Sequence, residues 1–147
     1  MTTTARGLTG ISELAGKDLG HTEWTPVGPD RAASFAHATD AGTHDPTDEG
    51  PLGGPVADGF HTLGLVGTLF DRLLRLADIR MNLIYGVNRV RFPAPVPLGA
   101  SVRLHATIAE VTELEGGGLS MLVDATLELA GETKPACVAQ VVYRVYD

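Results

Sequence analysis

The amino-acid sequence predicts an α+β fold, in which an antiparallel sheet wraps around one long central helix. The helix is predicted from residues 56–78, where apolar side chains recur at spacings of three and four. The sheet is predicted from period-two alternation of apolar and polar residues in four later segments, 81–92, 101–115, 118–130 and 134–147. Four consecutive strands joined by short Pro- and Gly-rich turns favour antiparallel pairing, with the helix packed across one face.

Three glycines lie within the predicted long helix, Gly59, Gly64 and Gly67. Each would weaken an isolated helix by roughly 1 kcal/mol relative to alanine. Small residues also allow a sheet to approach closely, so this helix is best buried against a wide, flat surface. A helix held in this way by an antiparallel sheet is the hot-dog architecture. Such a sheet usually has an exposed edge strand that a second protomer can cover, so we expect a homodimer.

The N-terminal half is predicted to add a short strand at 21–27 and a helix at 28–39. The candidates for the inward face of that helix are Ala33, Phe35 and Ala36. Residues 1–10 are rich in Thr and Gly and are expected to be flexible. Since no linker or internal repeat divides the rest of the chain, residues 11–147 are expected to form a single hot-dog domain.

The bulk properties describe an ordinary globular protein of 147 residues, with 44% hydrophobic and 20% charged residues. A net charge of −7 argues against a nucleic-acid partner. The single cysteine, Cys137, excludes an internal disulfide and fits the reducing cytoplasm. The most apolar long stretch, 60–77, contains three charged residues, so no membrane partner is expected. The chemistry of the protein must therefore be sought in a small-molecule site.

The segment "HATDAGTHDPTDEGPLGGPVADGFH", residues 37–61, is dense in His, Asp, Gly and Pro and leads directly into the long helix. Its potential metal ligands lack a rigid spacing, so we expect no metal site; they are His44, Asp45, Asp48 and Glu49. The chain also lacks a phosphate-binding loop and a serine nucleophile elbow. We expect no cofactor, and an acid–base site built on this segment.

Three stretches carry a resemblance to a known family. They are "GPLGGPVADGFHTLGL" (50–65), "YGVNRVRFPAPVPLGASVRL" (85–104) and "KPACVAQVV" (134–142). They resemble the MaoC-like dehydratases, the (R)-specific enoyl-CoA hydratases, and the likeness extends from about Leu14 to the end of the chain. The resemblance implies a hydro-lyase that reversibly hydrates a 2-enoyl thioester to an (R)-3-hydroxyacyl thioester. The acyl group would be bound to CoA or to an acyl-carrier protein.

The resemblance also implies the site residues. Asp40 and His44 would share the attacking water, and the backbone N–H of Gly59 would support the oxyanion at the start of the long helix. Arg89 and Arg91 are candidates for binding the phosphate-bearing end of the carrier. An acidic carrier protein would need these arginines to gather with Arg103 into a basic entrance, because the whole chain is acidic. The acyl chain, the carrier and the direction of reaction are left open.

Two departures from the family pattern bear on this site. His44 follows Asp40 by four residues where the family has five, and in extended backbone a shift of one residue turns the side chain to the opposite face. Asp58 replaces the histidine of the family's "AHG". A carboxylate about 4 Å from an enolate would oppose it by roughly 4 kcal/mol at an effective dielectric near 20. These departures suggest a specialised substrate, for example a polyketide-type intermediate.

The same residues allow other interpretations. Asp58 and His61 share a face of the first helical turn and could form a replacement dyad for isomerisation or cyclisation without water. Alternatively, the chain could be a catalytically silent hot-dog subunit. Each residue also has a structural explanation: Asp40 as a turn residue, Asp58 as a helix N-cap, His61 as a core histidine, and Arg89 and Arg91 as a solvated strand face.

Overall fold

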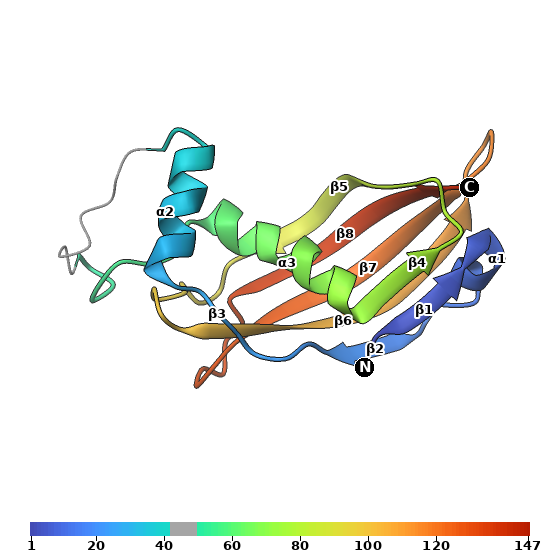
Figure 1. Ribbon diagram of the computed structural model, residues 1–147. Coiled ribbons are helices and arrows are strands. Elements are labelled where there is room, and N and C mark those ends of the chain that lie inside the picture. Colours follow the sequence, from blue (N-terminus) through green and yellow to red (C-terminus); the bar gives the residue numbers. More distant parts are fainter. Residues whose placement is uncertain (42–49) are drawn as a thin grey trace.

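The computed structural model describes residues 1–41 and 50–147. Within them the main sheet follows the strand order β2-β6-β7-β8-β5, and β3 adds a further short pairing to β6. All of its pairings are antiparallel, and the helix α3 lies across one face of the sheet (Figure 1). The predicted α+β hot-dog architecture is therefore confirmed. The sheet consists of β2 (Asp18–His21), β3 (Thr25–Pro26), β5 (Met81–Arg91), β6 (Ser101–Glu113), β7 (Leu119–Leu129) and β8 (Cys137–Tyr146).

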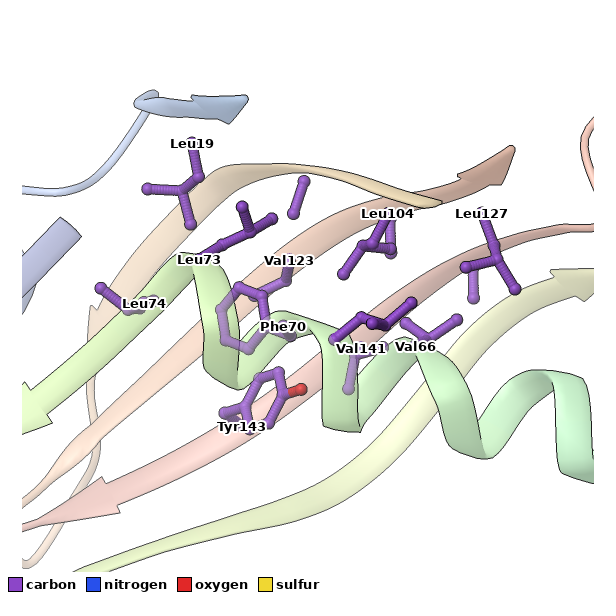
Figure 2. Packing of buried hydrophobic residues seen from close by; sticks show 14 of the residues in the cluster. Leu19, Val66, Phe70, Leu73, Leu74, Leu104, Val123, Leu127, Val141 and Tyr143 are labelled. Carbon is purple, nitrogen blue, oxygen red and sulfur yellow. The ribbon is translucent and has the colours of Figure 1, made fainter. Parts of the chain in front are cut away.

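The core forms where α3 (Gly59–Leu73) meets the inner face of the sheet. Side chains of β6, β7 and β8 alternate between this buried face and a more exposed one, as their sequence pattern predicts. The ring of Phe70 stacks on Tyr143 of β8, with 5.0 Å between ring centroids (Figure 2). The buried residues of α3 recur at helical spacing; they are Thr62, Val66, Leu69, Phe70 and Leu73. Burial of this stripe explains how a helix with three glycines remains stable.

The end of the long helix was predicted incorrectly. Helix α3 ends at Leu73, and the chain continues as the strand β4 (Leu74–Ala77), which pairs in parallel with β1 (Thr3–Arg6). Leu74 is buried and extended, with φ −130° and ψ 122°. Leu73, Leu74 and Leu76 fit both a helical and an alternating pattern, so sequence periodicity could not distinguish a helix from a strand here. Pairing with β1 stabilises the strand.

The same pairing corrects the expectation of a flexible N-terminus. Residues 3–6 form β1, and the following helix α1 (Gly7–Ser12) packs against it. Ala5 is buried and Ile11 is inaccessible to solvent, so both belong to the core. The first residues are thus an integral part of the fold in this structure, because β4 offers them a hydrogen-bonding edge.

The elements before the long helix also differ in detail from the prediction. The expected strand at 21–27 is divided between β2 and β3, both of which pair with β6. Helix α2 (Pro29–Ala38) matches the predicted helix, and Pro29 occupies its first turn. No residue of α2 is buried, and Ala33 is exposed while Phe35 and Ala36 are half-buried. The expected inward face is therefore only a partial contact.

Strand β5 forms one edge of the sheet and is exposed along most of its length. Its large apolar side chains remain accessible to solvent; they are Met81, Leu83, Ile84, Tyr85 and Val87. An exposed apolar edge strand is a template for pairing with another chain.

In the described part of the chain, none of the helices has the length and apolar character needed to cross a membrane.

Candidate active site

The candidate site is built around the first turn of α3. The carboxylate of Asp58 accepts a hydrogen bond from the backbone N–H of Phe60 at 2.7 Å, so Asp58 is the N-cap of the helix. Its backbone carbonyl accepts hydrogen bonds from the N–H and the hydroxyl of Thr62. The N–H of Gly59 has no hydrogen-bond acceptor among the described residues. This N–H lies at the positive end of a 15-residue helix and can bind an anionic oxygen.

The loop between β5 and β6 holds this helix start in place. The N–H of Ala57 donates to the carbonyl of Val96 at 2.8 Å, and the N–H of Leu98 donates to the carbonyl of Pro55 at 3.1 Å. These two bonds form a short antiparallel bridge directly before α3. The backbone that presents Gly59 is therefore fixed on both sides, which is what a preorganised hydrogen-bond donor requires.

The ring of Phe92 lies against Gly59. A side chain at Gly59 would meet the ring of Phe92 at 3.6 Å, and Phe92 itself is 44% exposed. Phe60, on the same helical turn, is 76% exposed. Apolar rings beside a hydrogen-bond donor strengthen its electrostatic effect once a ligand excludes water. Phe92 was not among the predicted site residues, although its position directly after the "YGVNRVR" segment was a usable signal.

The candidate phosphate-binding arginines lie at the end of β5. Arg91 directly precedes Phe92, and its guanidinium donates to the carbonyl of Val90. Arg89 has φ 54° and lies in a β-bulge, so the expected regular alternation of a strand face breaks down here. Arg103 is ion-paired with Glu128 at 2.6 Å, and that pair occupies its side chain on the sheet. Arg89 and Arg91 are both exposed at this end of β5.

His61 points from the first turn of α3 toward α2. Its imidazole stacks on the ring of Phe35, with 5.2 Å between centroids and 10° between planes. Burial lowers the pKa of His61, and Arg31 lowers it further against the opposing effect of Asp58. The Nδ1 atom is buried and has no hydrogen-bond partner among the described residues. Burial therefore favours the neutral form of the ring, and no hydrogen bond joins it to Asp58 in this part of the structure.

Asp40 lies just beyond the C-terminus of α2. Its φ of 53° is left-handed, and its N–H donates to the carbonyl of His37 at 3.3 Å. The chain turns sharply at Asp40, so the extended backbone on which the spacing argument depended is absent at this position. His44, the other member of the predicted pair, lies outside the described residues.

The structure thus brings three of the predicted residues together on one helical turn, Asp58, Gly59 and His61, and places Arg91 next to the ring that covers Gly59. Asp40 belongs to a different part of the chain, the turn that follows α2. Among residues 1–41 and 50–147, no group of three or more His, Cys, Asp or Glu side chains could hold a metal ion.

A hot-dog sheet packed on a helix, with an N–H at its first turn that no acceptor among the described residues occupies, defines a class of proteins that can bind an oxyanion there. The family model described as "MaoC like domain" matches residues 11–128. The chain belongs to this MaoC-like family, which confirms the family predicted from the three sequence stretches.

Relatives and solved structures agree with this assignment. The chain is 36% identical over 141 residues to 3-hydroxyacyl-thioester dehydratase Z of Mycobacterium tuberculosis, covering 91% of this chain and 92% of the relative. It is 34% identical over 146 residues to nodulation protein N of Rhizobium leguminosarum bv. viciae, covering 90% and 86%. The prediction of an enzyme of the hydro-lyase type is confirmed by the dehydratase relative and the family.

Among solved structures, the monoamine oxidase regulatory protein of Archaeoglobus superposes with a TM-score of 0.76 at 15% identity, covering 100% and 99% of the two chains. The (R)-hydratase of A. caviae involved in PHA biosynthesis gives 0.66 at 18% identity, covering 88% and 94%. A (3R)-hydroxyacyl-ACP dehydratase complex of M. tuberculosis gives 0.61 at 19% identity, covering 89% and 96%. At these identities the structures establish the shared hot-dog fold.

Proposed function

We propose that the protein is a hydratase/dehydratase that interconverts a 2-enoyl thioester and an (R)-3-hydroxyacyl thioester. The observation that carries the proposal is the unoccupied N–H of Gly59, fixed at the start of α3 and flanked by Phe92. It is supported by the relative named as a 3-hydroxyacyl-thioester dehydratase and by membership of the MaoC-like family. The acyl carrier is CoA or an acyl-carrier protein, and Arg89 and Arg91 bind its phosphate-bearing end.

In the proposed reaction, Asp40 and His44 hold and deprotonate a water molecule as its oxygen attacks Cβ of the enoyl thioester. The electron pair of the double bond moves through Cα onto the thioester oxygen, where the Gly59 N–H and the helix dipole stabilise it. The proton that Asp40 and His44 took from the water is then delivered to Cα, which restores the thioester and yields the 3-hydroxyacyl product. Dehydration is the reverse of these steps. No oxidant, metal or cofactor is consumed.

A second candidate function uses Asp58 and His61 as the acid–base pair. It is favoured by the lowered pKa of His61 and by its buried Nδ1, which lacks a partner in the described structure. It is disfavoured by the commitment of the Asp58 carboxylate to the N–H of Phe60. We therefore assign the leading role to Asp40 and His44, and propose for Asp58 a structural role as the helix cap.

The protein is proposed to act as a homodimer formed along β5, whose apolar side chains are exposed in the single chain. Some structural neighbours are complexes of different chains, such as the (3R)-hydroxyacyl-ACP dehydratase complex, so a second hot-dog subunit is the alternative partner. The departures around Asp40 and Asp58 favour a specialised acyl group over a simple fatty chain.

The proposal is tested by following the enone absorbance of trans-2-enoyl-CoA substrates of increasing length, beginning with crotonyl-CoA. Wild-type protein should remove the absorbance, and Asp40→Asn and His44→Ala should each lower kcat by at least about a hundredfold. Asp30→Asn provides the matched control, because Asp30 is an exposed carboxylate at the other end of α2. Full activity in Asp40→Asn would contradict the assignment of Asp40. Inactivity of the wild type toward every enoyl thioester would contradict the reaction.

A further inference from the structure

Helix α2 is weakly attached to the rest of the molecule. It has no buried residue, and no described hydrogen bond or ion pair joins it to another helix or strand. Figure 1 shows it at one end of the molecule, beside the beginning of α3 and beyond the sheet. The ring contact between Phe35 and His61 is a specific tie between α2 and α3. A helix that depends on so few contacts needs this one to keep its position.

The segment that follows Phe35 is bound tightly to it. The carbonyl of Phe35 accepts hydrogen bonds from the N–H of Thr39 at 3.1 Å and from its hydroxyl at 2.8 Å. The N–H of Ala41 donates to the carbonyl of Ala36 at 2.9 Å, which closes the turn around Asp40. Asp40 therefore moves with Phe35. At the other end of the tie, His61 is two residues from Gly59 on the same helical turn.

We propose that His61 is a positioning residue, whose ring docks Phe35 and so sets Asp40 in register with the N–H of Gly59. This inference rests on the proposed function, because it assumes that Asp40 and Gly59 act on one substrate. The path runs from Asp40 through the end of α2 to Phe35, across the stacked rings to His61, and back two residues to Gly59. His61 provides a flat ring against which Phe35 packs, and it transfers no proton to the substrate.

The surroundings of the imidazole support this role over a catalytic one. The rings are nearly parallel, as in offset stacking. The buried Nδ1 has neither donor nor acceptor in the described structure, and burial disfavours the charged form. A proton-transfer histidine is normally oriented by a hydrogen bond to its second nitrogen. Because a phenyl ring can provide the same stacking surface, phenylalanine should replace His61 with little loss.

The test compares Phe35→Ala, Phe35→Leu, His61→Ala and His61→Phe with the control Ser34→Ala. Ser34 is exposed on α2, and its hydroxyl donates only to the carbonyl of Asp30. Amide hydrogen exchange of residues 29–41 reports the attachment of α2 directly, without any substrate. Protection should fall in both alanine variants, should fall less in Phe35→Leu, and should be kept in His61→Phe and Ser34→Ala.

Kinetics with an enoyl thioester then test the effect on catalysis. Phe35→Ala and His61→Ala should lower kcat by about tenfold to a hundredfold with KM nearly unchanged, since misplacing a catalytic group by about 1 Å has effects of this size. The double variant should be no worse than either single one, whereas His61→Phe should stay within about threefold of wild type. Rescue by phenylalanine is a result that loss of a proton-transfer group would not produce.

Two outcomes would overturn the inference. Unchanged exchange of α2 in both alanine variants would show that the tie does not hold the helix, whatever the activity. A His61→Phe variant as inactive as His61→Ala would assign the imidazole a chemical role instead. An inactive wild type would instead overturn the proposed function, and the Phe35–His61 contact would then have no role in catalysis. The hydrogen-exchange results would still show whether this contact holds α2 in place.

Discussion

Asp58 is the residue at which structure and chemistry make opposite demands. Its carboxylate caps α3 through the N–H of Phe60, and the same negative charge lies beside the N–H of Gly59 that would bind an enolate. Asparagine caps a helix about as well as aspartate but carries no charge. The two demands can therefore be separated by single substitutions.

We expect Asp58→Asn to leave stability within about 0.5 kcal/mol of wild type and to keep or raise kcat, whereas Asp58→Ala should cost about 1 kcal/mol of stability. Urea unfolding and the enoyl-thioester assay measure the two effects. If Asp58→Asn instead lost activity by a hundredfold or more with stability unchanged, Asp58 would be the catalytic base and the Asp58–His61 dyad would replace the proposed one.

His61 predicts a pH dependence of stability. Its pKa in the folded protein lies below the ordinary value of 6.5, so the unfolded chain binds more protons as the pH falls below 6.5. The contribution of the neutral ring is present above pH 6.5 and is lost as the pH falls toward the folded pKa. His61→Phe should therefore lose less stability than wild type between pH 7 and pH 5.5. Urea midpoints at the two pH values give this difference, and equal losses would contradict it.

At the scale of elements, the turn between β6 and β7 depends on two glycines in different ways. Gly116 and Gly118 both have left-handed backbone, with φ of 87° and 86°. A side chain at Gly116 meets nothing within 4 Å, while at Gly118 it would lie 2.7 Å from the carbonyl oxygen of Val145 and 2.6 Å from the ring of Tyr146. The first position tolerates a side chain at the cost of backbone strain alone, and the second does not.

Gly116→Ala should consequently cost about 1 kcal/mol, the strain of a left-handed alanine. Gly118→Ala should cost at least about 2 kcal/mol, because the backbone of β8 must also move. Equilibrium unfolding of both variants measures the difference, and Gly116→Ala is the control for Gly118→Ala. Equal losses of unfolding free energy in the two variants would mean that the backbone of β8 at Val145 moves easily to accommodate the added methyl group.

At the scale of the whole molecule, the exposed edge β5 carries the prediction of a dimer. Ile84 is 54% exposed on this edge. Its Cδ1 atom lies 3.6 Å from the position that a Cβ at Gly67 would take. We expect the wild type to be dimeric by light scattering and Ile84→Asp to shift it toward monomer, because the substitution would bury a charge between the two edges. Leu52→Asp is the control, since Leu52 is equally exposed but lies outside the sheet. A monomeric wild type would contradict the prediction.

Much of this protein could be read from local patterns. Alternation along β6, β7 and β8 predicted the sheet because successive side chains of a strand face opposite sides wherever one side is buried. Helical spacing predicted α3, and the resemblance to the MaoC-like family implied Gly59 as the N–H donor near its start. These features depend on residues within a few positions of one another, so the sequence alone determined the fold class, the family and the position of Gly59.

Other features were decided only by contacts between distant segments. Residues 74–77 fit a helix as well as a strand, and β1, about seventy residues away, made them a strand. Asp58 and His61 looked like a pair by spacing, yet one side chain turns back to Phe60 and the other outward to Phe35 on α2. Phe92 lies against Gly59 although the two residues are far apart in the sequence. Local periodicity predicts on which face of a helix or strand a side chain lies. Which other segments contact that face is determined only by the tertiary packing.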